Sequence, residues 1–282
     1  MVRKLLASLL LLALYSLDAH AQLLVRYPNL NGTGEQGLGY KMLDLALRTA
    51  GTPYRIEQRR DLANNDRIRL MLDVGEVDVV DFGTSPEFEQ RYTAVYFPID
   101  RGLNGWRLLV VRRADAAKFA AINSVGELKH FIAGQGQGWS DVNVLRHAGL
   151  EVATVPQIEK LFRGLERGRF DFLPLGLNEA YSLTEHYAPS SQALCLDTHL
   201  VLVYPFARLF FVRKGNLALR ELIHSGLVKA FADGSFQRML ASDPGYAEAL
   251  RRAQLKQRAK LALDNPFLSA EFRKIPEAYF LK

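Results

Sequence analysis

Short apolar runs alternate along the chain with amphipathic segments that end at glycine, and this alternation limits the possible folds more than any other feature. Residues 23–28 form an apolar run that predicts a buried strand. Residues 38–51 follow with an apolar face at helical spacing and end on a glycine, a common helix cap. The apolar positions of that face are Leu43, Ala46, Leu47 and Ala50. Because this strand–helix order recurs, we predict an α/β protein with mainly parallel sheets.

The first 21 residues have the order of a secretory signal peptide. Arg3 and Lys4 precede an apolar run over residues 5–17, and Ala19-His20-Ala21 supplies a small-x-small ending. The run is shorter than the roughly 20 residues that span a bilayer, so we favour cleavage after Ala21 over an uncleaved anchor. We therefore expect residues 22–282 to form an exported, periplasmic chain.

Composition excludes several classes of protein. Hydrophobic residues make up 49% of the chain, which predicts a packed globule and not a disordered chain. The net charge of +6 comes from basic residues that are spread along the chain, so we expect no nucleic-acid partner. Cys195 is the single cysteine and has no disulfide partner within the chain. Scattered histidines and the lack of nucleotide-binding glycine motifs predict no metal and no cofactor.

Two β-rich stretches divide the sequence into lobes. They are "GWRLLVVRR" at 105–113 and "HLVLVYPFARLFF" at 199–211. We predict that lobe 1 begins with residues 22–108, that lobe 2 spans residues 109–202, and that residues 203–282 return to lobe 1 and end in a helical tail. Strand-like crossings of this kind bend as hinges.

The order of the segments resembles the type II periplasmic solute-binding proteins, in particular the amino-acid-binding members of bacterial extracellular solute-binding protein family 3. The resemblance implies a two-lobed fold in which each lobe is a central β-sheet flanked by helices, and two strand-like hinge crossings join the lobes. The matching segments are residues 39–51, 70–98, 105–113, 122–149, 160–175 and 208–240.

The resemblance implies that Arg91 binds the ligand. In amino-acid-binding members, an arginine that follows a Gly/Thr turn pairs with the ligand carboxylate, and Arg91 follows such a turn. A guanidinium donates two parallel hydrogen bonds to a carboxylate, and Thr84 and Ser85 supply further donors. The alternative is that Arg91 forms a surface ion pair with Glu87 or Glu89.

The sequence departs from the amino-acid-binding pattern in lobe 2. Those members usually carry an aspartate for the ligand ammonium where this chain has Gly176. Glu179 lies just beyond and is a candidate substitute. The sequence is therefore compatible with three kinds of ligand: an amino acid, another small carboxylate or a small peptide.

A second candidate wall of the site is "GQGQGWSD" at 134–141. Trp139 and Ser140 lie at a predicted helix start, where free backbone amides attract anions, unless Asp141 caps the helix itself. Trp106 and Tyr27 lie at strand ends, where they either stack on a ligand or pack in the core.

We therefore predict a periplasmic solute-binding protein that captures a small polar, carboxylate-bearing ligand between its lobes. The closed form would dock on the permease of an ABC transporter or on a sensor receptor. The sequence leaves two alternatives. One is a dehydratase-like enzyme on the same scaffold with Glu179 as its acid, and the other is a sensory or interaction module that binds no ligand.

Overall fold

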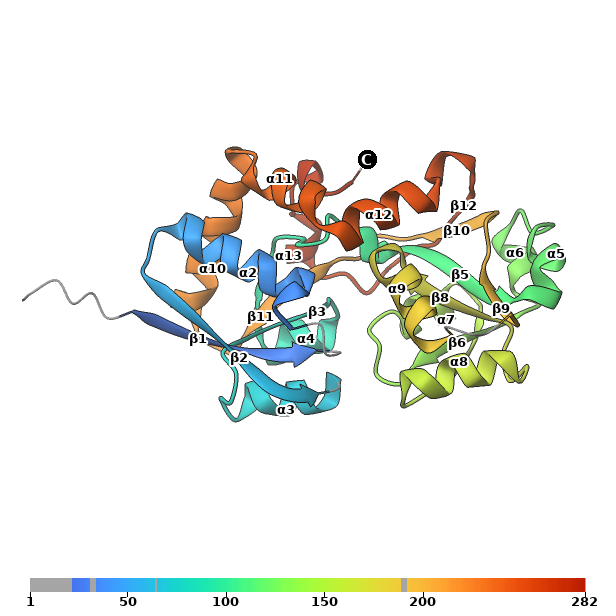
Figure 1. The fold of residues 1–282 in the computed structure, drawn as a ribbon, viewed down its shortest axis with the longest axis horizontal. Coiled ribbons are helices and arrows are strands. Elements are labelled where there is room, and N and C mark those ends of the chain that lie inside the picture. Colours follow the sequence, from blue (N-terminus) through green and yellow to red (C-terminus); the bar gives the residue numbers. More distant parts are fainter. Residues whose placement is uncertain (1–21, 31–33, 64, 189–191, 282) are drawn as a thin grey trace, which may run out of the picture.

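The chain folds into two α/β lobes that lie side by side (Figure 1). The structure is a computed structural model and describes residues 22–30, 34–63, 65–188 and 192–281. The predicted signal peptide, residues 1–21, lies outside the described residues. No helix in the described ranges is long and apolar enough to cross a membrane.

Lobe 1 contains two small sheets. Strands β1 (Leu23–Leu30) and β2 (Tyr54–Ala63) pair in parallel. Strands β3 (Val79–Gly83), β11 (Arg208–Val212) and β4 (Thr93–Val95) form an antiparallel sheet in the order β3-β11-β4. The Asp78 amide donates to the Arg26 carbonyl at 2.9 Å, which joins the start of β3 to β1.

Five helices surround these sheets: α2 (Leu38–Ala50), α3 (Asn65–Asp73), α4 (Pro86–Arg91), α10 (Leu217–Ala232) and α11 (Ser235–Ser242). Gly51 caps the C-terminal end of α2 with a φ of 82°, in the left-handed region, as the glycine at this position of the sequence predicted. Helices α2 and α10 pack closely because Gly226 has no side chain: a Cβ there would lie 1.9 Å from the Ala46 carbonyl oxygen.

Lobe 2 is built on one larger, mixed sheet in the order β12-β10-β5-β8-β6-β7, with β9 also pairing with β5. Its strands are β5 (Trp106–Arg112), β6 (Ile132–Gly136), β7 (Glu151–Val155), β8 (Phe172–Gly176), β9 (Leu194–Leu196), β10 (Leu200–Val203) and β12 (Ala259–Ala262). The sheet is less parallel than predicted, because β5 enters directly from lobe 1 and runs antiparallel to its neighbours β8, β9 and β10.

Short helices flank this sheet: α5 (Ala116–Phe119), α6 (Val125–Leu128), α7 (Val142–His147), α8 (Ile158–Glu166) and α9 (Leu177–Tyr187). Helix α6 begins with the capping box of Ser124 and Glu127 that its sequence pattern predicts. Helices α8 and α9 face the gap between the lobes in Figure 1.

The two crossings run from β4 to β5 and from β10 to β11. Strands β5 and β10 belong wholly to lobe 2, so the crossings themselves are the connecting residues 96–105 and 204–207. Buried Asp100 ties the first crossing to the start of β11, directly after the second crossing. Its Oδ1 accepts from the Gly102 amide at 3.0 Å and the Arg208 amide at 3.2 Å, and its Oδ2 accepts from the Asn104 amide at 2.8 Å.

The C-terminal segment does not stay with lobe 1, as residues 203–282 were expected to do. Helix α12 (Pro244–Ala253) packs on α9, and β12 then pairs in parallel with β10 of lobe 2. The chain returns through α13 (Ala270–Arg273) to the lobe 1 core, where Phe272 is buried. Within the predicted helical tail, α12 ends at Ala253, and the next residue, Gln254, adopts a left-handed φ of 47°.

Candidate functional site

A cavity of about 660 Å3 lies between the lobes. Lobe 1 contributes Gly83 and Arg208, the crossings contribute Asn104, and lobe 2 contributes the loop after β6 and the start of α9. A second cavity of about 390 Å3 adjoins it on the side of Tyr27 and α2, and both cavities are lined by Glu179 and Arg208. Together they form the inter-lobe cleft, in the size range of small-molecule sites.

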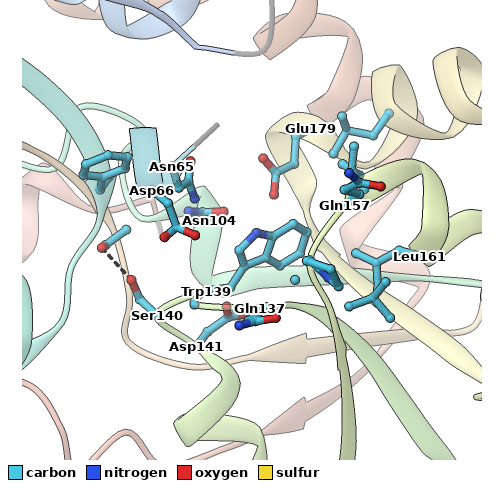
Figure 2. Close-up of a pocket in the computed structure, with 18 of the residues that line it drawn as sticks. Asn65, Asp66, Asn104, Gln137, Trp139, Ser140, Asp141, Gln157, Leu161 and Glu179 are labelled. Carbon is cyan, nitrogen blue, oxygen red and sulfur yellow. Dashed lines mark hydrogen bonds between the residues drawn. The ribbon is translucent and has the colours of Figure 1, made fainter. Parts of the chain in front are cut away.

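The loop after β6 forms the lobe 2 wall of the cleft. Gly136 leaves room for the indole ring of Trp139, since a Cβ there would lie 2.2 Å from the ring. Next to it, the Ser140 hydroxyl donates to the Gly83 carbonyl of lobe 1 at 2.9 Å. Figure 2 shows this bond at one side of the cavity, with the ring of Trp139 near its middle. The two walls of the cleft are therefore in direct contact at Ser140.

A buried ion pair stands behind this wall. The Arg107 guanidinium lies 2.9 Å from Oδ2 of Asp141, and both side chains are 3% exposed. Tyr204 joins them: its hydroxyl accepts from Arg107 Nε at 2.8 Å and donates to Asp141 Oδ2 at 2.7 Å. Burial, the largest single effect, works to lower the pKa of the Arg107 guanidinium, but Asp141, Tyr204 and Glu179 together outweigh it and raise that pKa above its ordinary value.

A second buried ion pair, between Arg208 and Asp81, lies on the lobe 1 side of the cleft. The Arg208 guanidinium contacts Asp81 Oδ2 through Nε at 2.9 Å and through Nη2 at 2.5 Å. The buried Tyr27 hydroxyl donates to the other oxygen of Asp81. Burial, followed by the charge of Asp81, raises the pKa of Tyr27 well above its ordinary value, so the hydroxyl keeps its proton. Both arginines of the cleft are thus engaged by carboxylates of the protein.

Three polar side chains gather where the two cavities meet. Glu179, in the first turn of α9, accepts from the Gly176 amide at 3.3 Å and lies 3.7 Å from Arg107 Nη1. The amide oxygens of Asn104 and Asn178 are buried and have no hydrogen-bond donor. Among the described residues, no cluster of three or more His, Cys, Asp or Glu side chains suits a metal ion.

The structure brings four of the predicted site residues to the cleft. Trp139, Ser140 and Glu179 line the larger cavity, and Tyr27 and Glu179 line the smaller one. Trp106 does not line either cavity; its ring instead packs under the Lys260 ammonium, 4.8 Å from the ring centroid.

Arg91, the predicted carboxylate anchor, lies outside the cleft. It is the last residue of α4 and forms an ion pair with Asp73, with its own side chain 51% exposed. Arg91 lines neither cavity and instead forms a surface ion pair, as in the alternative interpretation, but its partner is Asp73 and not Glu87 or Glu89.

Thr84 and Ser85 also serve lobe 1 itself. The Thr84 hydroxyl donates to Glu89 at 2.5 Å, and the Ser85 hydroxyl caps α4 by accepting from the Phe88 amide. Neither lines the two cavities. Their side chains therefore stabilise the turn beside the cleft.

Sequence reasoning missed Arg107, Arg208 and Asn104. A usable signal existed for the arginines, because Arg208 is the first residue of β11 and Arg107 the second residue of β5, each directly after a crossing. Both crossings border the cleft, so polar side chains in the first two residues of β5 and β11 are candidates to line it. Asn104 sits in the short helical turn Leu103–Gly105 and has no sequence signal of its own.

Comparison with known proteins supports the fold. A scan against protein-family models gave no match, and a search of curated proteins also gave none. Solved structures do match. An ancestral arginine-binding protein bound to arginine gives a TM-score of 0.56 at 19% identity, over 78% of this chain and 97% of that one. An amino acid ABC transporter substrate-binding protein from Streptococcus pneumoniae bound to L-arginine gives a TM-score of 0.56 at 14% identity, over 81% of this chain and 94% of that one.

A histidine kinase sensor domain, described as similar to periplasmic binding proteins, gives a TM-score of 0.60 at 15% identity, over 81% of this chain and 98% of that one. Because the sequence identities are below 20%, these structural matches establish the fold of this chain and nothing finer. The chain has the type II periplasmic binding protein fold, and the solved structures that match it include amino-acid-binding proteins and a histidine kinase sensor domain. The fold predicted from the sequence is confirmed.

Proposed function

We propose that this protein is a solute-binding protein that captures a small polar solute between its lobes. The observation that carries this proposal is the inter-lobe cleft: a cavity of about 660 Å3 whose walls come from both lobes and from the crossings. A solute held there contacts residues that move relative to one another when the lobes rotate about the crossings. It therefore favours the closed arrangement by its extra affinity for that state.

The fold relatives favour two destinations for the bound form. One relative is named as the substrate-binding protein of an amino acid ABC transporter, and another as the sensor domain of a histidine kinase. We propose that the closed form of this chain docks on a transporter or a sensor in the same way. The signal-peptide pattern of residues 1–21 supports a periplasmic location.

The cleft provides its own reporter of binding. The chain has two tryptophans, of which Trp139 lines the larger cavity and Trp106 packs under Lys260 away from it. A panel of amino acids, amines, dicarboxylates and short peptides is screened by thermal shift and by tryptophan emission. A true ligand at about 100 times its Kd adds about 2.7 kcal/mol of stability.

We expect a hit to change the emission of the wild type and of Trp106→Phe, and to leave Trp139→Phe silent while its melting temperature still rises. Small-angle scattering should show a smaller radius of gyration with the ligand. If no compound of a broad panel raises the melting temperature, solute capture is the wrong function. Product formation from a bound compound would favour an enzyme instead.

A further inference from the structure

We propose that residues 243–281, which we call the C-terminal strap, tie the two lobes together beside the crossings and limit how far the cleft opens. The inference goes beyond solute capture, because it concerns the motion of the lobes with or without a solute. The strap leaves lobe 1 in α12, forms β12 on lobe 2 and returns to lobe 1 through α13. Figure 1 shows α12 reaching from α11 in lobe 1 to α9 in lobe 2.

Lobe 1 holds the first turn of α12. Lys41 of α2 lies 2.6 Å from Oδ2 of Asp243, whose side chain is 8% exposed. The other oxygen of Asp243 caps α12 by accepting from the Tyr246 amide at 2.9 Å. One carboxylate therefore starts the helix and fixes that start to lobe 1. Because it is buried, water screens its ion pair less than an exposed pair.

Lobe 2 holds the other end of α12. The Arg258 side chain, between α12 and β12, is 4% exposed. Its Nη1 donates to the Asp197 and Leu200 carbonyls of lobe 2, each at 2.8 Å. Its Nε donates to the carbonyl of Ala253, the last residue of α12, at 2.6 Å. Helix α12 is therefore a connection fixed to lobe 1 at one end and to lobe 2 at the other.

The return path of the strap contacts the second crossing. The Leu263 amide donates to the Val203 carbonyl at 2.9 Å, directly before that crossing. The buried Asn265 side chain then donates from Nδ2 to the carbonyl of Pro205, within the crossing, at 2.8 Å. Arg273 of α13 donates in turn to the Asn265 carbonyl at 3.3 Å. The strap thus binds residues that change conformation when the lobes rotate about this crossing.

The end of the strap contacts the first crossing. Arg101 of that crossing has a φ of 54°, which is uncommon for a residue other than glycine. Its guanidinium donates to the Phe280 carbonyl at 2.8 Å, and its own carbonyl accepts from the Leu281 amide at 2.8 Å. Gly102 packs so closely that a Cβ there would lie 2.7 Å from the Phe280 ring. The first crossing cannot change its backbone angles freely without releasing these contacts.

The strap therefore adds two links between the lobes and restrains both crossings. A hinge works when a few residues absorb large changes in φ and ψ. In this chain the hinge residues hydrogen-bond to the strap, and α12 spans the lobes beside them. We expect a smaller range of opening than two free crossings would give, which favours the closed cleft in which Ser140 contacts Gly83.

The test severs the strap and measures the distance between the lobes. A site-specific protease sequence is inserted between Pro266 and Phe267, both exposed in the return path. Spin labels are attached at Gln90→Cys on α4 and Lys160→Cys on α8, in a Cys195→Ala background. Both positions are exposed and lie outside the strap and the two cavities. Double electron–electron resonance records the distance distribution before and after cleavage, without added solute.

We expect cleavage to broaden the distance distribution and to move its mean to a longer distance. An unchanged distribution in the cut, folded protein would overturn the proposal. Because no solute is used, that result would leave solute capture standing, and a failed solute screen would leave the strap standing.

A second variant decides the matter if a thermal melt shows that cleavage unfolds the protein. Lys41→Met combined with Asn265→Ala keeps the chain intact and removes one strap contact in lobe 1 and one at the second crossing. Arg251→Gln is the control, because Arg251 is exposed on α12 and pairs with Glu248 of the same helix. We expect a broader distribution in the double variant and a wild-type distribution in the control. Equal distributions in all three proteins would overturn the proposal.

Discussion

Replacing Asp141 by asparagine should destabilise the protein far more than the same change at Asp73. Each aspartate pairs with one arginine, but the Arg107–Asp141 pair has both side chains 3% exposed, whereas Arg91 is 51% exposed beside Asp73. Both hydrogen bonds at Asp141 end on Oδ2, so an asparagine that places its oxygen there keeps them and removes only the charge. The substitution therefore isolates the electrostatic part of the pair.

The expected magnitude follows from burial. Removing one partner of a buried ion pair costs about 3–5 kcal/mol, because the remaining charge has lost its solvent and its counter-ion. In this protein Glu179 stays 3.7 Å from Arg107 Nη1 and compensates part of the lost charge, so we expect the lower end, about 3 kcal/mol. The exposed pair is screened by water, and Asp73→Asn should cost less than about 1 kcal/mol.

Urea denaturation followed by circular dichroism measures both variants against the wild type. We expect the midpoint to fall strongly for Asp141→Asn and slightly for Asp73→Asn, with the slope m unchanged, which would show that the surface exposed on unfolding is the same. A loss of about 1 kcal/mol or less for Asp141→Asn, or equal losses for the two variants, would refute the view that Arg107 needs a buried counter-charge.

Three further changes test the packing, the pH dependence and the revised site. Gly226→Ala should destabilise the protein strongly, since the new Cβ would lie 1.9 Å from the Ala46 carbonyl oxygen. Gly245→Ala, in the exposed first turn of α12, should instead stabilise the protein by up to about 1 kcal/mol. Thermal melts that rank the two variants the other way would contradict the close contact between α2 and α10. Burial lowers the pKa of His224, so the unfolded chain binds the proton more tightly and the folded protein loses stability as pH falls below about 6.5. Urea titrations of His224→Gln should show a smaller loss of stability over that range. An equal loss in the wild type and the variant would be evidence against a role for His224 in the pH dependence. Arg91→Ala should leave ligand affinity unchanged in calorimetry, because Arg91 lies outside the cleft, and a loss of tenfold or more would return it to the site.

Local patterns predicted much of the fold. The glycine that ends α2, the capping box of α6 and the alternation of strands with helices act over a few residues, so they can be read without knowing the rest of the chain. The same holds for the loop that carries Trp139 and Ser140, because a glycine-rich turn between a strand and a helix borders the end of its sheet. Local sequence alone therefore predicts these elements.

The C-terminal segment shows where such reading fails. Residues 259–262 continue an apolar pattern that suited a helix, yet they form β12. The edge of β10 in lobe 2 was open for pairing, and the parallel bonds formed there outweigh the helical preference of the segment. Only the position of β10 in space reveals that free edge.

What the sequence by itself determined is the alternation of strands with helices and one wall of the cleft, because both follow from local periodicity and turn chemistry, whereas the two-lobed arrangement was implied by the resemblance to a known family. What only the tertiary structure decided is which charges meet. The position of Arg91 in the sequence predicted a ligand anchor, yet Arg91 lies at the end of α4 and forms an exposed ion pair with Asp73. Arg107 and Arg208, which follow the crossings, line the cleft instead, and each pairs with a buried carboxylate. Ion pairing depends on distances between residues far apart in sequence, and those distances exist only in the folded chain.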